Sequence, residues 1–148
     1  MPRELVYRVL EAAADDVILV GGQALAYWMD RYGIRQPGDL PAISRDVDFF
    51  TPNAANSAPL ELFARAIRGR AQIENERAIT ALIGSAIAPA EDARVYNVDL
   101  LHSIVGLGRD HIDENAVVVE VPGGQSTFRI LHPLDVLQSR NANLHVLA

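Results

Sequence analysis

The pattern of hydrophobic and polar positions predicts a chain in which helices and strands alternate. A continuous apolar run at 17–20 is typical of a strand that is buried on both faces. The segment 95–101 alternates instead, so that Asn97 and Asp99 share one face of a strand. Further strands are expected at 47–51 and at 79–83, where Gly84 and Ser85 interrupt the apolar run. A hairpin is expected at 117–121 and 126–131. Helices are expected at 4–14, 23–32 and 58–68 and from Pro133 onward, with a loop or short helix at 106–115.

Apolar side chains at helical spacing mark the side of each helix that should face the core. The inward residues are expected to be Ala24, Leu25 and Trp28 in the second helix, Leu62 and Ala66, with Phe63 as a further candidate, in the third, and Leu134, Leu137 and Leu144 in the last. Together these elements predict an α/β (or α+β) fold, in which a small mixed sheet carries helices mainly on one side.

The length of 148 residues suits a single domain with its own core, and is short for two domains. The apolar residues Leu144, Val146 and Leu147 near the end of the chain need a surface to pack against. We therefore expect either a homo-oligomer or an additional C-terminal region, in which case residues 1–148 form the N-terminal part of a longer protein.

The composition is that of an ordinary globular protein, with 49% apolar and 22% charged residues. No apolar run is long enough to span a bilayer, and the first residues lack the pattern of a signal peptide. The absence of cysteine excludes disulfides and thiolate metal sites and agrees with a cytoplasmic protein. We expect no membrane partner, because no apolar run is long enough. The net charge of −6 weighs against a long nucleic acid as partner, since such binding usually rests on a basic surface.

Gly21 and Gly22 connect the apolar strand at 17–20 to the helix that follows. Glycines at such a junction allow the backbone to approach a phosphate closely, and the first amide groups of the helix point towards it. The junction therefore indicates a phosphate-binding site. A plain tight turn is an equally good interpretation of the two glycines taken alone.

Asp46 and Asp48 lie two residues apart where the strand at 47–51 begins. Side chains at i and i+2 of a strand point the same way, about 6.5–7 Å apart. Two carboxylates in this arrangement repel each other unless a cation or water separates them. Oxygen ligands favour Mg²⁺ or Mn²⁺, and Mg²⁺ commonly enters a site together with nucleotide phosphates. The alternative interpretation is the polar beginning of an edge strand.

Asp99 is the third carboxylate of interest, because it stands between Val98 and Leu100 in an otherwise apolar strand. A carboxylate in such a place is costly unless it is paired, hydrogen-bonded or bound to a metal. If its strand lies beside the one that carries Asp46 and Asp48, the three could hold two metal ions about 3.5–4 Å apart. That separation is the one used in phosphoryl and nucleotidyl transfer.

The order of these features resembles the nucleotidyltransferase superfamily typified by DNA polymerase beta. The shared order is a hydrophobic strand, Gly-Gly, a helix, Asp-hydrophobic-Asp on a strand, and a lone aspartate on a later strand. Within that superfamily, segments 20–28 and 44–49 are similar to the abortive-infection type of nucleotidyltransferase toxin. The resemblance covers residues 17–101.

This resemblance implies an enzyme that uses Mg²⁺ (or Mn²⁺) to transfer a nucleoside monophosphate from an NTP to an acceptor hydroxyl. Asp46 and Asp48 would bridge the metal ions. Asp99 would bind the catalytic metal and help to deprotonate the attacking hydroxyl.

The same resemblance implies nucleotide-binding roles for Gly21, Gly22, Gln23, Ser44 and Arg45. The glycines would hold the triphosphate, and Ser44 and Arg45 would contact phosphates. The acceptor stays open: the acidic net charge favours a small molecule or a protein, whereas the likeness to toxins favours RNA.

Three other interpretations of the sequence stay open. The first is a catalytically inert module that keeps the fold, such as a toxin–antitoxin partner. The second is an antibiotic-modifying nucleotidyltransferase. The third is a dinucleotide-binding unit, which also begins with a strand, glycines and a helix and has an acid about 20 residues later. Segment 21–26 lacks the G-x-G-x-x-G pattern, however, and the acids open the second strand instead of ending it.

Overall fold

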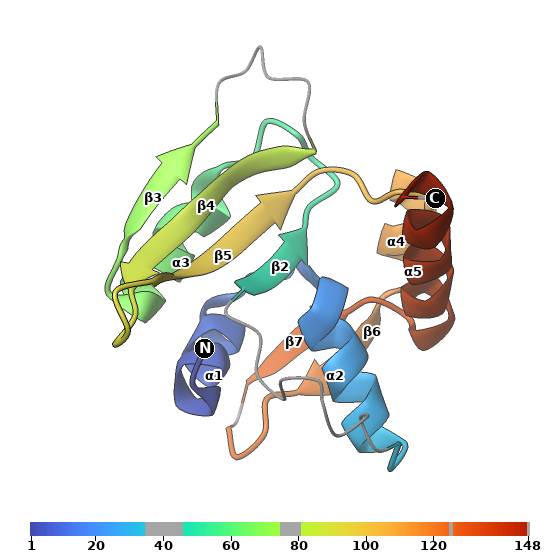
Figure 1. The fold of residues 1–148 in the computed structure, drawn as a ribbon. Coiled ribbons are helices and arrows are strands. Elements are labelled where there is room, and N and C mark those ends of the chain that lie inside the picture. The colour runs from blue at the N-terminus through green and yellow to red at the C-terminus, as the bar shows by residue number, and fades with distance from the viewer. Residues whose placement is uncertain (35–45, 75–80, 125, 148) are drawn as a thin grey trace.

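The computed structural model describes residues 1–34, 46–74, 81–124 and 126–147, with side chains up to residue 142. Seven strands and five helices occupy these ranges (Figure 1). The helices are α1 (Arg3–Ala12), α2 (Gly21–Arg31), α3 (Ala58–Ile67), α4 (Arg109–Asn115) and α5 (Pro133–Leu147). The strands are β1 (Ile18–Val20), β2 (Asp46–Phe50), β3 (Arg70–Ile73), β4 (Leu82–Pro89), β5 (Val95–Leu101), β6 (Val117–Glu120) and β7 (Thr127–Ile130).

The strands of the described ranges form one mixed sheet in the order β3-β4-β5-β2-β1-β7-β6. Two pairs are parallel, β2 with β5 and β1 with β7, and the remaining neighbours are antiparallel. The predicted fold class and the predicted hairpin of β6 and β7 are confirmed. The two strands that carry the predicted carboxylates, β2 and β5, lie side by side near the middle of the sheet.

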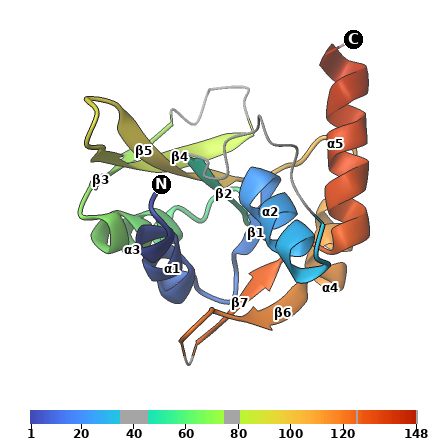
Figure 2. The same cartoon turned by 60° about the horizontal axis from the view of Figure 1, so that its bottom comes forward.

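Helices α1, α2 and α3 cover one face of this sheet, which we call the helix face. Leu19 of β1 and Phe49 of β2 are register partners, and both are buried on it. The ring of Phe49 stacks on Phe63 of α3 with centroids 4.6 Å apart. Figure 2 shows α1 and α3 side by side below the sheet, whereas α4 and α5 lie at one end, near α2.

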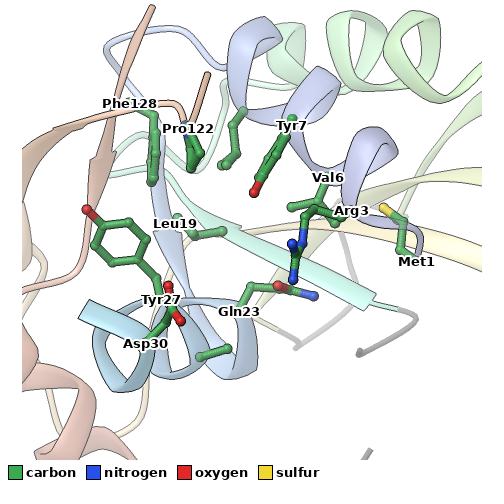
Figure 3. Close-up of a pocket in the computed structure, with 12 residues that line it drawn as sticks. Met1, Arg3, Val6, Tyr7, Leu19, Gln23, Tyr27, Asp30, Pro122 and Phe128 are labelled. Carbon is green, nitrogen blue, oxygen red and sulfur yellow. The ribbon is translucent and has the colours of Figure 1, made fainter. Parts of the chain in front are cut away.

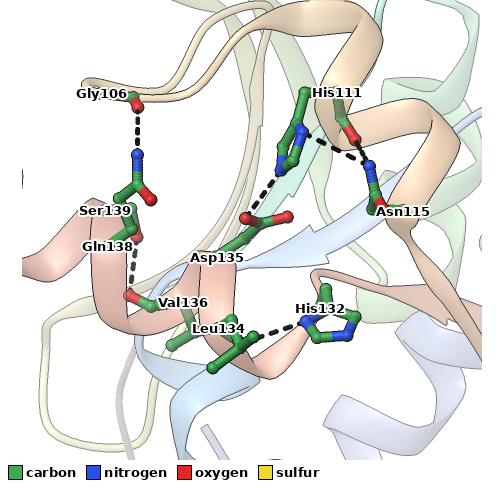
Figure 4. Close-up of polar contacts among 9 residues, drawn as sticks. All are labelled: Gly106, His111, Asn115, His132, Leu134, Asp135, Val136, Gln138 and Ser139. Carbon is green, nitrogen blue, oxygen red and sulfur yellow. Dashed lines mark hydrogen bonds and ion pairs between the residues drawn. The ribbon is translucent and has the colours of Figure 1, made fainter.

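Polar contacts attach the C-terminal helix to the rest of the domain. The indole nitrogen of Trp28 on α2 donates to the carbonyl oxygen of Leu131, 2.9 Å away, just before α5 begins. Trp28 is buried, as predicted. Nε2 of His111 on α4 lies 2.9 Å from Oδ1 of Asp135, which is only 6% exposed (Figure 4). These contacts determine which side of α5 faces inward.

The inward side of α5 is not the predicted one. Leu134 and Leu137 are 69% and 60% exposed, and the side chain of Leu144 lies outside the described residues. The buried residues of α5, among those whose side chains are described, are Asp135, Val136 and Ser139. Apolar spacing failed here because the ion pair of Asp135 with His111 of α4 orients the helix. The buried hydroxyl of Ser139 is satisfied within α5, where it donates to the carbonyl oxygen of Val136. No helix of the described ranges has the length and apolar composition that a membrane span requires.

A second expectation about an inward residue is also wrong, because Leu62 of α3 is 41% exposed. The neighbouring Phe63 is fully buried in its place, since its ring fits against Phe49. Ala66 packs against the core as predicted.

The strand predicted at 79–83 is displaced. Residues 79 and 80 lie outside the described ranges, and β4 runs from Leu82 through Gly84 and Ser85 to Pro89. Gly84 shifts the register with β5 but does not end the strand. A Cβ there would stand 2.5 Å from the carbonyl oxygen of Gln72 on β3 and 2.7 Å from the side chain of Leu60 on α3. Glycine instead permits close packing of α3 against the strand. The adjacent edge strand β3 was not predicted, since its residues are mostly exposed and carry little apolar signal.

Candidate functional site

The register of β2 and β5 places Asp48 directly opposite Asp99. Adjacent strands lie about 4.8 Å apart, and paired residues point to the same face of a sheet. The neighbouring Val47 and Val98 are fully buried on the helix face, so the two carboxyl groups point to the opposite one. We call this opposite side the carboxylate face.

Ser85 of β4 extends this pair into a row of three side chains, Asp48, Asp99 and Ser85, which we call the carboxylate row. It is the register partner of Asp99 on the other side of β5, and its hydroxyl donates to Oδ1 of Asp99 at 2.7 Å. The bond fixes the orientation of the carboxyl group and leaves its second oxygen for another partner. The carboxyl groups of Asp99 and Asp48 can share a proton, and this hydrogen bond raises the pKa of Asp48 and lowers that of Asp99.

Asp46 lies on the same face, two residues before Asp48 and opposite Asn97. Its negative charge raises the pKa of both Asp48 and Asp99, so it is close to them. The structure therefore brings the three predicted carboxylates together. Asn97 adds an oxygen, Oδ1, that is buried and has no hydrogen-bond partner among the described residues.

The electrostatics of this site oppose full ionisation. Burial, followed by the negative charges of Asp99 and Asp46, raises the pKa of Asp48 to about 6. Burial also raises the pKa of Asp99, although the hydrogen bond from Ser85 lowers it. Carboxylates that repel one another in a partly buried place are what a divalent cation would neutralise.

The residues present fit a hard cation such as Mg²⁺ in chemistry, because the donors are carboxylate, amide and hydroxyl oxygens. Among the described residues, however, no three His, Cys, Asp or Glu side chains are arranged to hold one ion. Asp48 and Asp99 are the pair that would hold it. Asp46 and phosphate or water oxygens would complete the coordination, since Mg²⁺ usually keeps ligands of this kind.

Gly21 joins this row to the first turn of α2. Its φ is +69°, and a Cβ at this position would stand 2.6 Å from Oδ2 of Asp48. Val20, which precedes it, is extended, and no side chain caps the amide groups of the first turn of α2. Gly22 is exposed, with nothing within 4 Å of where its Cβ would be. The junction thus places the backbone amides of a helix start beside the carboxylates, as an anion site requires.

The remaining predicted nucleotide contacts are Gln23, Ser44 and Arg45. Gln23 lines a cavity on the helix face, together with Leu19 of β1. Ser44 and Arg45 lie outside the described residues. Their roles stay predictions.

Two members of the site were not predicted. Ser85 was taken as part of a break in a strand, and Asn97 was noted only for sharing a face with Asp99. The signal for Asn97 was available, because polar residues two apart in an alternating strand share a face. Nothing in the sequence alone indicates that Ser85 pairs with Asp99.

Comparisons with known proteins return a match only at the level of structure. No protein-family model and no curated protein matches the chain. It is similar to the crystal structure of JHP933 from Helicobacter pylori, with 16% identity and a TM-score of 0.51 over 90% of this chain and 51% of that one. It is also similar to an H. pylori protein provisionally described as a nucleotidyltransferase, with 18% identity and a TM-score of 0.53 over 90% of this chain and 53% of that one. The chain therefore has a nucleotidyltransferase-like fold and spans about half the length of these solved structures.

Proposed function

We propose that the chain carries the catalytic domain of a metal-dependent nucleotidyltransferase, which transfers a nucleoside monophosphate from an NTP to an acceptor hydroxyl. The observation that supports this most is the row of Asp48, Asp99 and Ser85 beside the uncapped start of α2. Carboxylates for a cation and backbone amides for an anion lie together, as a metal–triphosphate substrate requires. The nucleotidyltransferase-like fold agrees with this chemistry.

Each part of the site has a role in this proposal. The first turn of α2, from Gly21, receives the triphosphate. Asp48 and Asp99, with Asp46 completing the coordination, would hold Mg²⁺ (or Mn²⁺), which when bound would neutralise charge on the phosphates. Asp99, oriented by Ser85, accepts the proton of the acceptor hydroxyl. The acceptor oxygen then forms a bond to the α-phosphorus, the bond from that phosphorus to the bridging oxygen breaks, and pyrophosphate leaves.

The main alternative is an inert module with the same fold. It is favoured by the lack, among the described residues, of three side chains arranged to hold a metal. The acceptor is a separate question, because the chain spans about half of the structures it resembles. A small molecule such as an antibiotic, a protein and RNA are the candidates. The abortive-infection resemblance favours RNA, whereas the net charge of −6 favours the other two.

Calorimetry with Mg²⁺ and each of the four NTPs tests the first part of the proposal. We expect the wild-type chain to bind at least one NTP in a Mg²⁺-dependent manner and Asp48→Asn to lose that binding. Asp110→Asn is a matched control, because Asp110 is exposed and lies on α4, outside the group of Asp46, Asp48 and Asp99. Equal binding by the two variants would contradict the proposal.

Transfer of α-³²P label from the bound NTP to material in a cell extract tests the second part. Label in RNA, protein or small molecules would identify the class of acceptor. Mg²⁺-dependent NTP binding without any transfer would favour the inert module.

A further inference from the structure

A cavity of about 420 Å³ lies between α1, α2 and the hairpin of β6 and β7. This volume is within the range of small-molecule sites, roughly 300–1,000 Å³. Apolar side chains line much of it, with Leu19, Val6 and Phe128 around its centre (Figure 3). The chemistry described above does not use this cavity.

The cavity and the carboxylate row are on opposite faces of the sheet. Leu19 points into the cavity and is the register partner of Phe49, which is buried on the helix face. Val20 is the partner of Asp48, which points to the carboxylate face. A ligand in the cavity is therefore separated by the sheet from a nucleotide on the row.

Three hydrogen-bond donors point into one part of the cavity. Figure 3 shows the guanidinium of Arg3 and the amide of Gln23 close together, with the hydroxyl of Tyr7 turned towards the same space. None of these three side chains forms a hydrogen bond or ion pair with another described residue. Guanidinium, amide and hydroxyl groups that converge without a partner suit an anionic oxygen group, since each can donate to it.

The other end of the cavity carries a negative charge, opposite in sign to that of Arg3. Asp30 of α2 lies beside Tyr27 there, and it also has no partner among the described side chains (Figure 3). A second negative group on a ligand would be repelled at this end. The arrangement therefore disfavours polyanions such as nucleoside triphosphates.

We propose that this cavity binds a small molecule with one anionic oxygen group, a carboxylate or a phosphate monoester, on an apolar or aromatic body. Arg3, Tyr7 and Gln23 bind the anionic end. Leu19 and Phe128 contact the body, which gains the free energy of leaving water. The site is distinct from the nucleotide site and does not depend on the proposed transfer activity.

Three probes that share a phenyl ring test this assignment: phenylacetate, phenyl phosphate and the uncharged phenylacetamide. Isothermal titration and two-dimensional NMR of the labelled protein give the affinities and the residues that respond. We expect at least one anion to shift Tyr7 and Phe128 and to bind about tenfold or more tightly than the amide, because a hydrogen bond to a charged group contributes roughly 1.5–3 kcal/mol. The tighter of the two anions identifies the chemistry of the natural ligand.

Arg3→Gln should weaken binding of the anion about tenfold. Arg8→Gln is the matched control, since it removes the same charge from an exposed residue of the same helix that does not line the cavity. Ala26→Phe should abolish binding of every probe, because the new ring occupies the cavity. Asp48→Asn should bind the probes normally, which separates this proposal from the nucleotidyl-transfer proposal.

Three results would overturn the assignment. They are the absence of NMR shifts at millimolar phenylacetate and phenyl phosphate, equal losses in Arg3→Gln and Arg8→Gln, and unchanged binding in a folded Ala26→Phe variant. Circular dichroism establishes that the variant is folded.

Discussion

The backbone of Gly21 lies against the carboxyl group of Asp48, so close that a Cβ on residue 21 would stand 2.6 Å from Oδ2. The positive φ of Gly21 places it there and begins α2 at the same point. The position of the first turn of α2 and the position of the Asp48 carboxyl group therefore depend on each other. A change at Gly21 should affect both the stability of the fold and the position of Asp48.

Gly21→Ala should lower the free energy of unfolding by about 1–3 kcal/mol, because alanine at a positive φ is strained and its methyl group collides with Asp48. Urea unfolding followed by circular dichroism measures this change. Gly22→Ala is the control, since nothing lies within 4 Å of a Cβ there. In α2 it should leave stability unchanged or raise it by up to about 1 kcal/mol. Equal losses in the two variants would contradict the close contact.

The stability of the metal-free protein should fall as pH rises, because the pKa of Asp48 is raised from 3.8 to about 6 by burial and by the charges of Asp99 and Asp46. The folded state then holds this proton more tightly than the unfolded state. The loss of stability that this causes is absent below pH 3.8, grows between pH 3.8 and 6, and is complete above pH 6. Asp48→Asn cannot ionise, so above pH 6 it should be more stable than the wild type by at most about 3 kcal/mol.

Urea unfolding of both proteins in EDTA, from pH 4 to 8, tests this dependence. The difference in the free energy of unfolding should be smallest at pH 4 and level off above pH 6. A difference that does not change with pH would show that Asp48 ionises normally in the folded protein.

The carboxylate row could be predicted in large part from the sequence. Strand alternation puts Asp46 and Asp48 on one face, and a lone Asp99 in an apolar strand indicates a partner. What the sequence could not supply is the neighbour of each strand. The parallel pairing of β2 with β5 joins segments separated by α3, β3 and β4, so it depends on packing of the whole sheet.

The two main errors have a common cause, which is that tertiary contacts overrode local pattern. Gly84 suggested a break, yet the strand continues through it, and the glycine is there because Gln72 of β3 and Leu60 of α3 lie too close for a side chain. Leu134 and Leu137 suggested an inward face, yet the contact of Asp135 with His111 turns α5 the other way. Neither contact leaves a local signal, since the partners are distant in the chain.

His111→Ala should destabilise the attachment of α5, because it leaves the buried carboxyl group of Asp135 without its partner. We expect the free energy of unfolding to fall by about 1–3 kcal/mol. The fluorescence of Trp28, whose indole bonds just before α5, would report the local change. Asn115→Ala is the control, since the amide of Asn115 donates to the backbone carbonyl oxygen of His111 and lies near Nδ1, whereas Asp135 is bound by Nε2. A loss no larger than that of the control would contradict a role for this pair.

Ser85→Ala should impair the site without disturbing the fold, because it removes the hydrogen bond that orients Asp99. That bond lowers the pKa of Asp99, so the variant should show a higher pKa for this carboxyl group in a ¹³C NMR titration. If the chain is a nucleotidyltransferase, kcat should also fall about tenfold, as expected for loss of a charge-assisted hydrogen bond. The NMR result holds whether or not the enzyme proposal is right.

Ser85→Thr is the matched variant, because threonine keeps the hydroxyl and suits a strand. It should restore both the pKa of Asp99 and most of kcat, whereas a purely structural role for residue 85 would make the two variants differ in stability alone. Equal Asp99 titrations in Ser85→Ala, Ser85→Thr and the wild type would show that the hydroxyl does not act on Asp99. The row would then consist of Asp48 and Asp99 only, with β4 serving as a support.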